Sequence, residues 1–210
     1  MTTSYLTDTL LQLVESIEPK TTDSYIMSAI GKSETLSQQS ILIAMGDRLE
    51  VFWNQVFSDF ATNLIEDTTE ITGVYKVGPK KGQNKTKTKK NNKVKVGKSN
   101  RQIDHYFVTK GGTKIYMESK CNLNFDTEKV VASNKKVGEV MDALGADQGV
   151  YFVPVLPIIP LEVMTEYYKN GREIFGVVDV LDLIDAPFTA TEYFDFLKND
   201  VAKVLENKGL

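Results

Sequence analysis

Three side chains between positions 104 and 120 have the chemistry to act together on a phosphate ester. Asp104 precedes one strand-like apolar run, and Glu118 and Lys120 lie at the end of a second run, beyond a Gly111-Gly112 turn. A hard divalent cation binds carboxylate oxygens, and a neighbouring lysine can position or deprotonate a water molecule. These residue types therefore indicate metal-assisted attack on a phosphodiester.

Whether the three side chains meet depends on the register of the hairpin that carries them. Side chains alternate between the two faces of a strand, so a shift of one residue moves a side chain to the other face. A two-residue turn at Gly111-Gly112 would place Asp104 and Glu118 on opposite faces. A three-residue loop over 110–112 places Asp104 opposite Glu118, with Lys120 on the same face. We predict the three-residue loop or an equivalent bulge.

Three other conspicuous residues have structural interpretations. His105, the only histidine, falls on the opposite hairpin face, and we expect it to pack or form a hydrogen bond rather than carry protons. Trp53 lies in the apolar stripe of a long helix, which favours the core. The single Cys121 excludes an internal disulfide and a cysteine-rich zinc site, and we expect it to be a small core residue.

Hydrophobic periodicity predicts the elements that must position the hairpin. Before the hairpin we expect helices over 5–17, about 23–30 and Ser33 to about Glu66, and then a strand over 71–77. After the hairpin we expect a helix over 126–144, a strand over 149–156, a helix over 161–169, a strand over 176–181 and a helix over 191–206. The strand over 149–156 is apolar enough to be a parallel strand buried on both faces. This order predicts an α/β fold, a mixed sheet with helices on both sides.

Length and composition favour one globular domain. The chain has 210 residues, of which 41% are hydrophobic. It lacks the run of about 20 apolar residues that spans a membrane and the basic, apolar start of a secretory signal, so the cytoplasm is the expected location. Within a single domain, 1–210, we distinguish an N-terminal helical segment (1–33), a core with a basic loop at 78–100 (34–156) and a C-terminal helix-strand-helix (157–210).

Positive charge is concentrated in the segment before the hairpin. Between Lys76 and Arg101 lie 11 of the chain's 25 basic residues and no acidic one, although the formal net charge is -3. The segment could be simply a solvated, disordered loop. A loop of this kind can also order along a phosphate backbone. It therefore predicts contact with nucleic acid through Lys80, Lys81, Lys85, Lys87, Lys89, Lys90, Lys93, Lys95, Lys98 and Arg101.

The pattern resembles the PD-(D/E)xK nuclease superfamily, which includes many type II restriction endonucleases. An Asp opens one strand, Glu-x-Lys ends its hairpin partner, and a helix and a strand follow. The superfamily core, a helix, three strands, a helix and a strand, matches 34–156, although Ile103 stands where the motif name has Pro. The resemblance implies a restriction-endonuclease-like fold, Mg²⁺, hydrolysis of DNA phosphodiesters and commonly a homodimer.

The resemblance also suggests a role for each site residue. Asp104, Glu118 and the backbone carbonyl of Ser119 would hold Mg²⁺, and Lys120 would bind the scissile phosphate or the attacking water. Superfamily members often place an acid from the first core helix near the metal. Glu50 is the candidate by position and Glu34 the second choice, while the plainer interpretation of Glu50 is a solvent-facing helix residue. By their position after the catalytic strand, Asn122, Lys135 and Lys136 could contact the DNA backbone.

Three functions remain open. The leading prediction is a hydrolase, a Mg²⁺-dependent type II restriction endonuclease that cuts a short palindrome in double-stranded DNA as a symmetric dimer. A structure-selective nuclease, such as a Holliday junction resolvase or a repair nuclease, would share the site. A non-catalytic nucleic-acid-binding protein would keep the basic segment and use the three site residues as ordinary surface charges.

Overall fold

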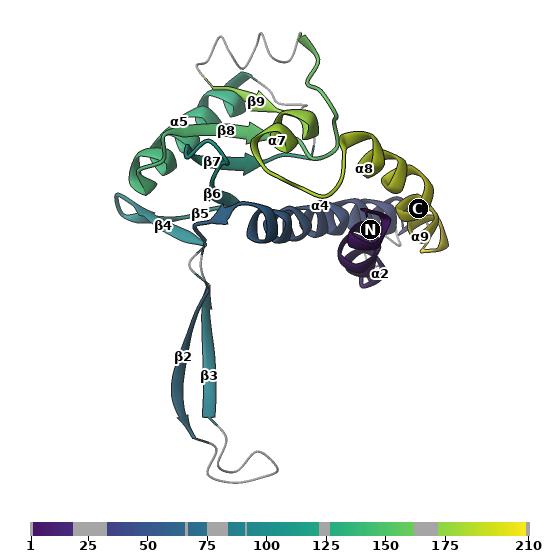
Figure 1. Cartoon of the computed structure of the whole chain (residues 1–210), viewed down its shortest axis with the longest axis horizontal. Helices are drawn as coiled ribbons and strands as arrows, with labels where there is room; N and C mark the ends of the chain where they lie inside the picture. Colours follow the sequence, from purple (N-terminus) through teal and green to yellow (C-terminus); the bar gives the residue numbers. More distant parts are fainter. Residues whose placement is uncertain are drawn as a thin grey trace.

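A five-stranded mixed sheet forms the centre of the molecule (Figure 1). The computed structural model describes residues 2–18, 33–65, 67–74, 84–90, 92–121, 127–161 and 172–208. The sheet has the order β1-β6-β7-β8-β9, with antiparallel pairs up to β7 and parallel pairs beyond it. Its strands are β1 (Thr62–Asn63), β6 (His105–Val108), β7 (Lys114–Ser119), β8 (Gln148–Phe152) and β9 (Ile174–Phe175). The predicted α/β class and the parallel β8 are confirmed.

Most of the predicted helices are present. The described helices are α1 (Thr2–Leu6), η1 (Thr7–Leu11), α2 (Gln12–Glu15), α4 (Ser33–Phe60), α5 (Thr127–Leu144), α7 (Val177–Leu183), α8 (Ala190–Phe196), η2 (Leu197–Val201) and α9 (Ala202–Asn207). The helices predicted over 5–17, 126–144 and 191–206 are confirmed. The helix predicted over 23–30 lies outside the described residues. Of the helix predicted over 161–169, the structure describes residue 161 alone. None of the helices in the described ranges has the length and hydrophobicity of a transmembrane span.

Helices cover both faces of the sheet, and the alternation of β7 shows this directly. Ile115 and Met117 belong to a hydrophobic cluster that includes Trp53 and other residues of α4. Tyr116, between them in sequence, belongs to a second cluster with Val137 and other residues of α5. Neighbouring strand residues point to opposite faces, so α4 and α5 lie on opposite sides of the sheet. The predicted flanking helices are confirmed.

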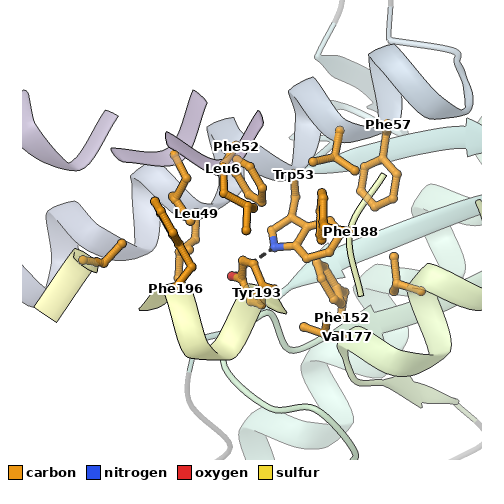
Figure 2. Packing of buried hydrophobic residues seen from close by; sticks show 14 of the residues in the cluster. Leu6, Leu49, Phe52, Trp53, Phe57, Phe152, Val177, Phe188, Tyr193 and Phe196 are labelled. Atoms are coloured by element: carbon orange, nitrogen blue, oxygen red, sulfur yellow. Dashed lines mark hydrogen bonds between the residues drawn. The ribbon is translucent and has the colours of Figure 1, made fainter. Parts of the chain in front are cut away.

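Aromatic side chains of α4 pack against the sheet (Figure 2). Trp53 is fully buried and meets Phe152 of β8 edge-on, with ring centroids 5.0 Å apart. Phe57 stacks on Phe107 of β6 at 4.1 Å. Such pairs add to the burial of large apolar side chains, so this end of α4 holds a fixed position under β6 and β8. The predicted core position of Trp53 is confirmed.

Helix α4 ends six residues earlier than its apolar pattern predicts. The helix stops at Phe60, and β1 begins at Thr62. Thr62 pairs with Val108, and the Leu64 amide donates to the Tyr106 carbonyl at 2.8 Å. Pairing with β6 supplies the backbone hydrogen bonds that another turn of helix would have made, and it overrides the helical apolar pattern.

The basic segment contains strands, so the prediction of a loop over 78–100 is wrong for much of its length. These strands are β3 (Asn84–Lys90), β4 (Lys93–Val96) and β5 (Ser99–Gln102), and β3 pairs with β2 (Asp67–Val74), which precedes the basic segment. The β2 and β3 strands pair antiparallel and project from the rest of the chain (Figure 1). The strand predicted over 71–77 coincides with β2 up to Val74, and 75–77 lies outside the described residues. Lysine-rich composition favours disorder, but cross-strand backbone hydrogen bonds do not depend on side-chain charge.

The strand predicted over 176–181 is also wrong. Residues 177–183 form α7, and the strand, β9, is the preceding pair Ile174–Phe175. The Gly176 amide donates to the Asp179 carboxylate at 2.8 Å, which caps the first turn of the helix. Val177 and Val180 lie three residues apart and are both buried. Their β-branched side chains suggested a strand, whereas their spacing also fits one face of a helix.

Candidate active site

The hairpin that carries the candidate residues has the predicted register. His105 pairs with Met117 and Phe107 with Ile115 across β6 and β7. The loop closes with the Thr109 amide donating to the Thr113 carbonyl at 2.9 Å. Gly112 has a φ of 85°, a conformation that residues with a Cβ rarely adopt. The three-residue loop over 110–112 is therefore confirmed.

Asp104 lies directly before β6 and is held against the end of β7. Its Oδ2 accepts a hydrogen bond from the Ser119 amide at 3.0 Å. Asp104 and Glu118 retain only 9% and 4% of their exposure, so both carboxyl groups are buried. A buried carboxylate is costly unless it is hydrogen-bonded or paired, and each of these two has partners.

Glu118 is the most highly coordinated group of the site. Its Oε2 accepts from the Tyr116 hydroxyl at 2.7 Å, and its Oε1 accepts from the Lys120 ammonium at 2.8 Å. The Lys136 ammonium donates to both oxygens, at 2.6 Å and 2.8 Å. Burial alone would raise the pKa of Glu118, but the charge of Lys120 and the hydrogen bonds of both lysines hold it below the usual glutamate value. Glu118 is thus ionised at neutral pH.

Asp104 has the opposite electrostatic environment. Burial first, then repulsion from Glu118 and Glu50, raises the pKa of Asp104 from 3.8 to about 7. The hydrogen bond from Ser119 and the charge of Lys136 only partly oppose this rise. The two carboxyl groups therefore interact, as expected if they share one face of the hairpin. Paired acids with opposite pKa shifts are common at catalytic and metal-binding sites.

Glu50 contributes a third carboxyl group from α4. It is half-buried, and Gln102 of β5 donates to its Oε1 at 3.5 Å. Burial and then Asp47 raise the pKa of Glu50, with a further contribution from Glu118. Glu50 therefore lies within electrostatic range of the hairpin acids and does not simply face solvent. The side chain of Glu34, the second choice, lies outside the described residues.

Of the two neighbouring acids, Glu118 raises the pKa of Asp104 more than Glu50 does. Among the described residues, no three Asp, Glu, His or Cys side chains form a group tight enough to hold a metal ion. Asp104 and Glu118 would thus be the protein carboxylates of a metal site, with Glu50 as a more weakly interacting neighbour. A Mg²⁺ ion commonly uses one or two carboxylates and completes its coordination with water and substrate phosphate.

Two contacts of Glu118 are absent from the sequence-based site. The sequence predicts Lys136 as a contact to the DNA backbone, whereas in the structure its ammonium binds Glu118. The contact from Tyr116 to Glu118 is absent from the predicted site. Tyr116 precedes Glu118 by two residues, so the strand period places it on the same face. Lys136 lies beside Val137, which faces the sheet, and a lysine at the edge of a buried helix face can reach inward.

The predictions for His105 and Cys121, which lie beside the site, have different outcomes. His105 is fully buried and its Nδ1 lies 2.8 Å from Asn54 Oδ1, so its predicted role in packing and hydrogen bonding is confirmed. Burial lowers the pKa of His105 to about 3, which keeps the ring neutral. The prediction of a core position for Cys121 is wrong. Strand β7 ends at Ser119, and Cys121 is exposed.

The predicted DNA contacts lie on two β-ribbons and on α5. Lys85, Lys87, Lys89 and Lys90 belong to β3. Lys93, Lys95, Lys98 and Arg101 are exposed on the β4–β5 hairpin, and Lys135 is exposed on α5. Val94 and Val96, which alternate with Lys93 and Lys95, pack against the cluster under α5. Lys80, Lys81 and Asn122 lie outside the described residues.

The raised pKa of Asp104 predicts how the stability of the metal-free protein depends on pH. Between pH 3.8 and about 7 the folded state binds this proton more tightly than the unfolded state does. The contribution of Asp104 to the free energy of unfolding therefore falls as pH rises through this window. Urea unfolding in EDTA measures the free energy of unfolding at pH 5 and at pH 8. Its decrease from pH 5 to pH 8 should be smaller in Asp104→Asn than in the wild type. Equal losses in both proteins would contradict the burial and repulsion described above.

Comparison with known proteins does not assign this chain to a family. No protein-family model matches the chain, and no curated protein matches it significantly. The chemistry of Asp104, Glu118, Lys120 and their neighbours is consequently the basis for a functional assignment.

Proposed function

We propose that this protein is a Mg²⁺-dependent endonuclease that hydrolyses phosphodiester bonds in double-stranded DNA, as type II restriction endonucleases do. The observation that carries this proposal is that Asp104, Glu118 and Lys120 interact at one end of the β6–β7 hairpin, whose register places Asp104 opposite Glu118. Helix α5 and the parallel strand β8 follow, as in the core of the PD-(D/E)xK superfamily. A restriction-endonuclease-like fold is part of the proposal.

The donor set of the site fits Mg²⁺. The two buried carboxyl groups interact, and burial together with repulsion from Glu118 raises the pKa of Asp104. A divalent cation held by Asp104, Glu118 and the Ser119 carbonyl would relieve that repulsion with the oxygen ligands that it prefers. When bound, Mg²⁺ would neutralise charge on the scissile phosphate and lower the pKa of a coordinated water.

Lys120 is placed to act beside that centre. Its side chain is 25% exposed, and its ammonium lies 2.8 Å from Glu118 Oε1. It is thus anchored by the carboxylate and still open to solvent on one side. We assign it to the scissile phosphate or to the attacking water, where a fixed cation or proton carrier assists the displacement.

The basic ribbons supply the binding surface in this proposal. A two-stranded ribbon has the width to enter the major groove of DNA, and β2–β3 projects from the molecule (Figure 1). The exposed cations of β4–β5 lie closer to the site, because Gln102 of the same hairpin donates to Glu50. Palindromic cleavage would require a homodimer with its two sites related by a twofold axis. A cytoplasmic location with access to DNA is part of the proposal.

Plasmid cleavage tests this function. We expect the protein to nick or linearise supercoiled plasmid with Mg²⁺ and to do nothing in EDTA. Digestion of a long linear duplex should give discrete bands, as expected of a site-specific enzyme. Preference for a four-way junction over the duplex would instead identify a structure-selective nuclease. Binding to DNA without cleavage under every Mg²⁺ concentration tried would reject the enzyme and leave a nucleic-acid-binding protein.

A further inference from the structure

Lys136 binds the two carboxylate oxygens of Glu118 that a metal ion would also bind. Its ammonium spans both carboxylate oxygens, at 2.6 Å and 2.8 Å, whereas Lys120 contacts Oε1 alone. A cation that bridges both oxygens of a carboxylate occupies the position of a bidentate metal ion. With Tyr116 also donating to Oε2, Glu118 has four donor contacts and no oxygen that lacks a partner.

The Lys136 side chain can move away from Glu118 without disturbing the rest of the site. It is 29% exposed, so a path to solvent is open. It comes from α5, whereas Glu118 and Lys120 belong to the β7 end of the sheet, so its release would not disturb the hairpin that sets the acid pair. A lysine ammonium on a flexible four-carbon stem can move several ångströms by rotation about its side-chain bonds.

We propose that Lys136 competes with the divalent metal for Glu118 and is displaced when the metal binds. The inference rests on the proposed nuclease function for the identity of the metal, but not for the contacts that Lys136 makes. In the metal-free protein Lys136 neutralises a buried carboxylate that would otherwise be costly. When the metal arrives, the freed ammonium lies beside the position of the substrate phosphate, a group that it can bind.

Competition makes a directional prediction for metal affinity. Lys136→Met removes the charge and keeps most of the aliphatic stem, so Mg²⁺ should bind at least about tenfold more tightly than in the wild type, a difference of about 1.4 kcal/mol. Lys136→Arg keeps a cation that can bridge the carboxylate, and its affinity should stay near the wild-type value. Calorimetric titration with Mg²⁺ without DNA measures both, and Mn²⁺ titration followed by electron paramagnetic resonance gives an independent readout.

The matched control is Lys135→Met, which removes a neighbouring charge from the same helix. Its side chain is 77% exposed and lies 3.9 Å from Glu139, so metal affinity in the absence of DNA should barely change. Circular dichroism should show that each variant is folded. If Lys136→Met does not fold, Lys136→Gln serves instead, because its amide can still donate one hydrogen bond to Glu118.

Unchanged or weaker metal binding in Lys136→Met would overturn the competition. If the metal affinity is unchanged and DNA cleavage at saturating Mg²⁺ is also lost, Lys136 instead contacts the substrate phosphate. The nuclease proposal fails separately, if the wild type binds Mg²⁺ and leaves DNA intact. If neither the wild type nor Lys136→Met binds Mg²⁺, both ideas are rejected.

Discussion

Glu118→Gln will lower the rate of Mg²⁺-dependent DNA cleavage by about a thousandfold or more. The substitution preserves the size of the side chain and removes its negative charge. The lost charge is the partner of two ammonium groups, Lys120 and Lys136, and a metal ligand in the proposed function. Single-turnover cleavage of a supercoiled plasmid at saturating Mg²⁺ measures the chemical step.

Two further variants separate loss of chemistry from loss of structure. Lys120→Ala should also abolish cleavage, while Glu206→Gln, which removes an exposed acid on α9, should cleave at the wild-type rate. Both lysines that face Glu118 retain a route to solvent, so Glu118→Gln should still fold, which a thermal melt checks. Wild-type cleavage in both Glu118→Gln and Lys120→Ala would show that the site lies elsewhere.

Replacing five lysines of strands β3 and β4 by glutamine will weaken DNA binding by about a hundredfold or more at 0.1 M salt. The five are Lys85, Lys87, Lys89, Lys90 and Lys93. Each lysine that neutralises a phosphate adds about 0.9 to the magnitude of the slope of log K against log salt, so this magnitude should fall by about 4.5 if all five do so. Fluorescence anisotropy with a labelled duplex in EDTA, at several salt concentrations, gives the slope without cleavage.

Substitution rather than deletion preserves the β2–β3 pairing, which uses backbone hydrogen bonds. The control is the double variant Lys198→Gln, Lys203→Gln, whose side chains are exposed on the C-terminal helices. It changes the net charge without altering β3 or β4, and its salt slope should stay close to the wild-type value. An unaltered slope in the five-lysine variant would exclude these five lysines from the phosphate contacts.

Local rules were enough to predict the hairpin. A period of two along each strand and a short turn at Gly111-Gly112 leave few registers, and the three-residue loop places Asp104 and Glu118 on one face. Helix α5 and strand β8 were also predictable, because a long amphipathic stretch and a continuous apolar run have few alternatives.

Local rules failed where a short segment fitted two structures. The residues of α7 are β-branched and apolar, and only the cap at Gly176 and the burial of Val177 and Val180 distinguish a helix from a strand. The basic segment has no hydrophobic core of its own to predict, yet its strands pair through their backbones. In both segments, hydrogen bonds and burial in the folded chain outweighed the preference of the residue types.

The sequence by itself determined the acid pair, the lysine beside it and the elements that carry them, because adjacent strands joined by a short turn have few possible registers. Only the tertiary structure decided what surrounds the pair. Lys136 reaches Glu118 because α5 lies across one face of the sheet, and Glu50 approaches because α4 lies across the other. The angle and position at which a helix packs depend on all the side chains between the layers, and no local pattern encodes them.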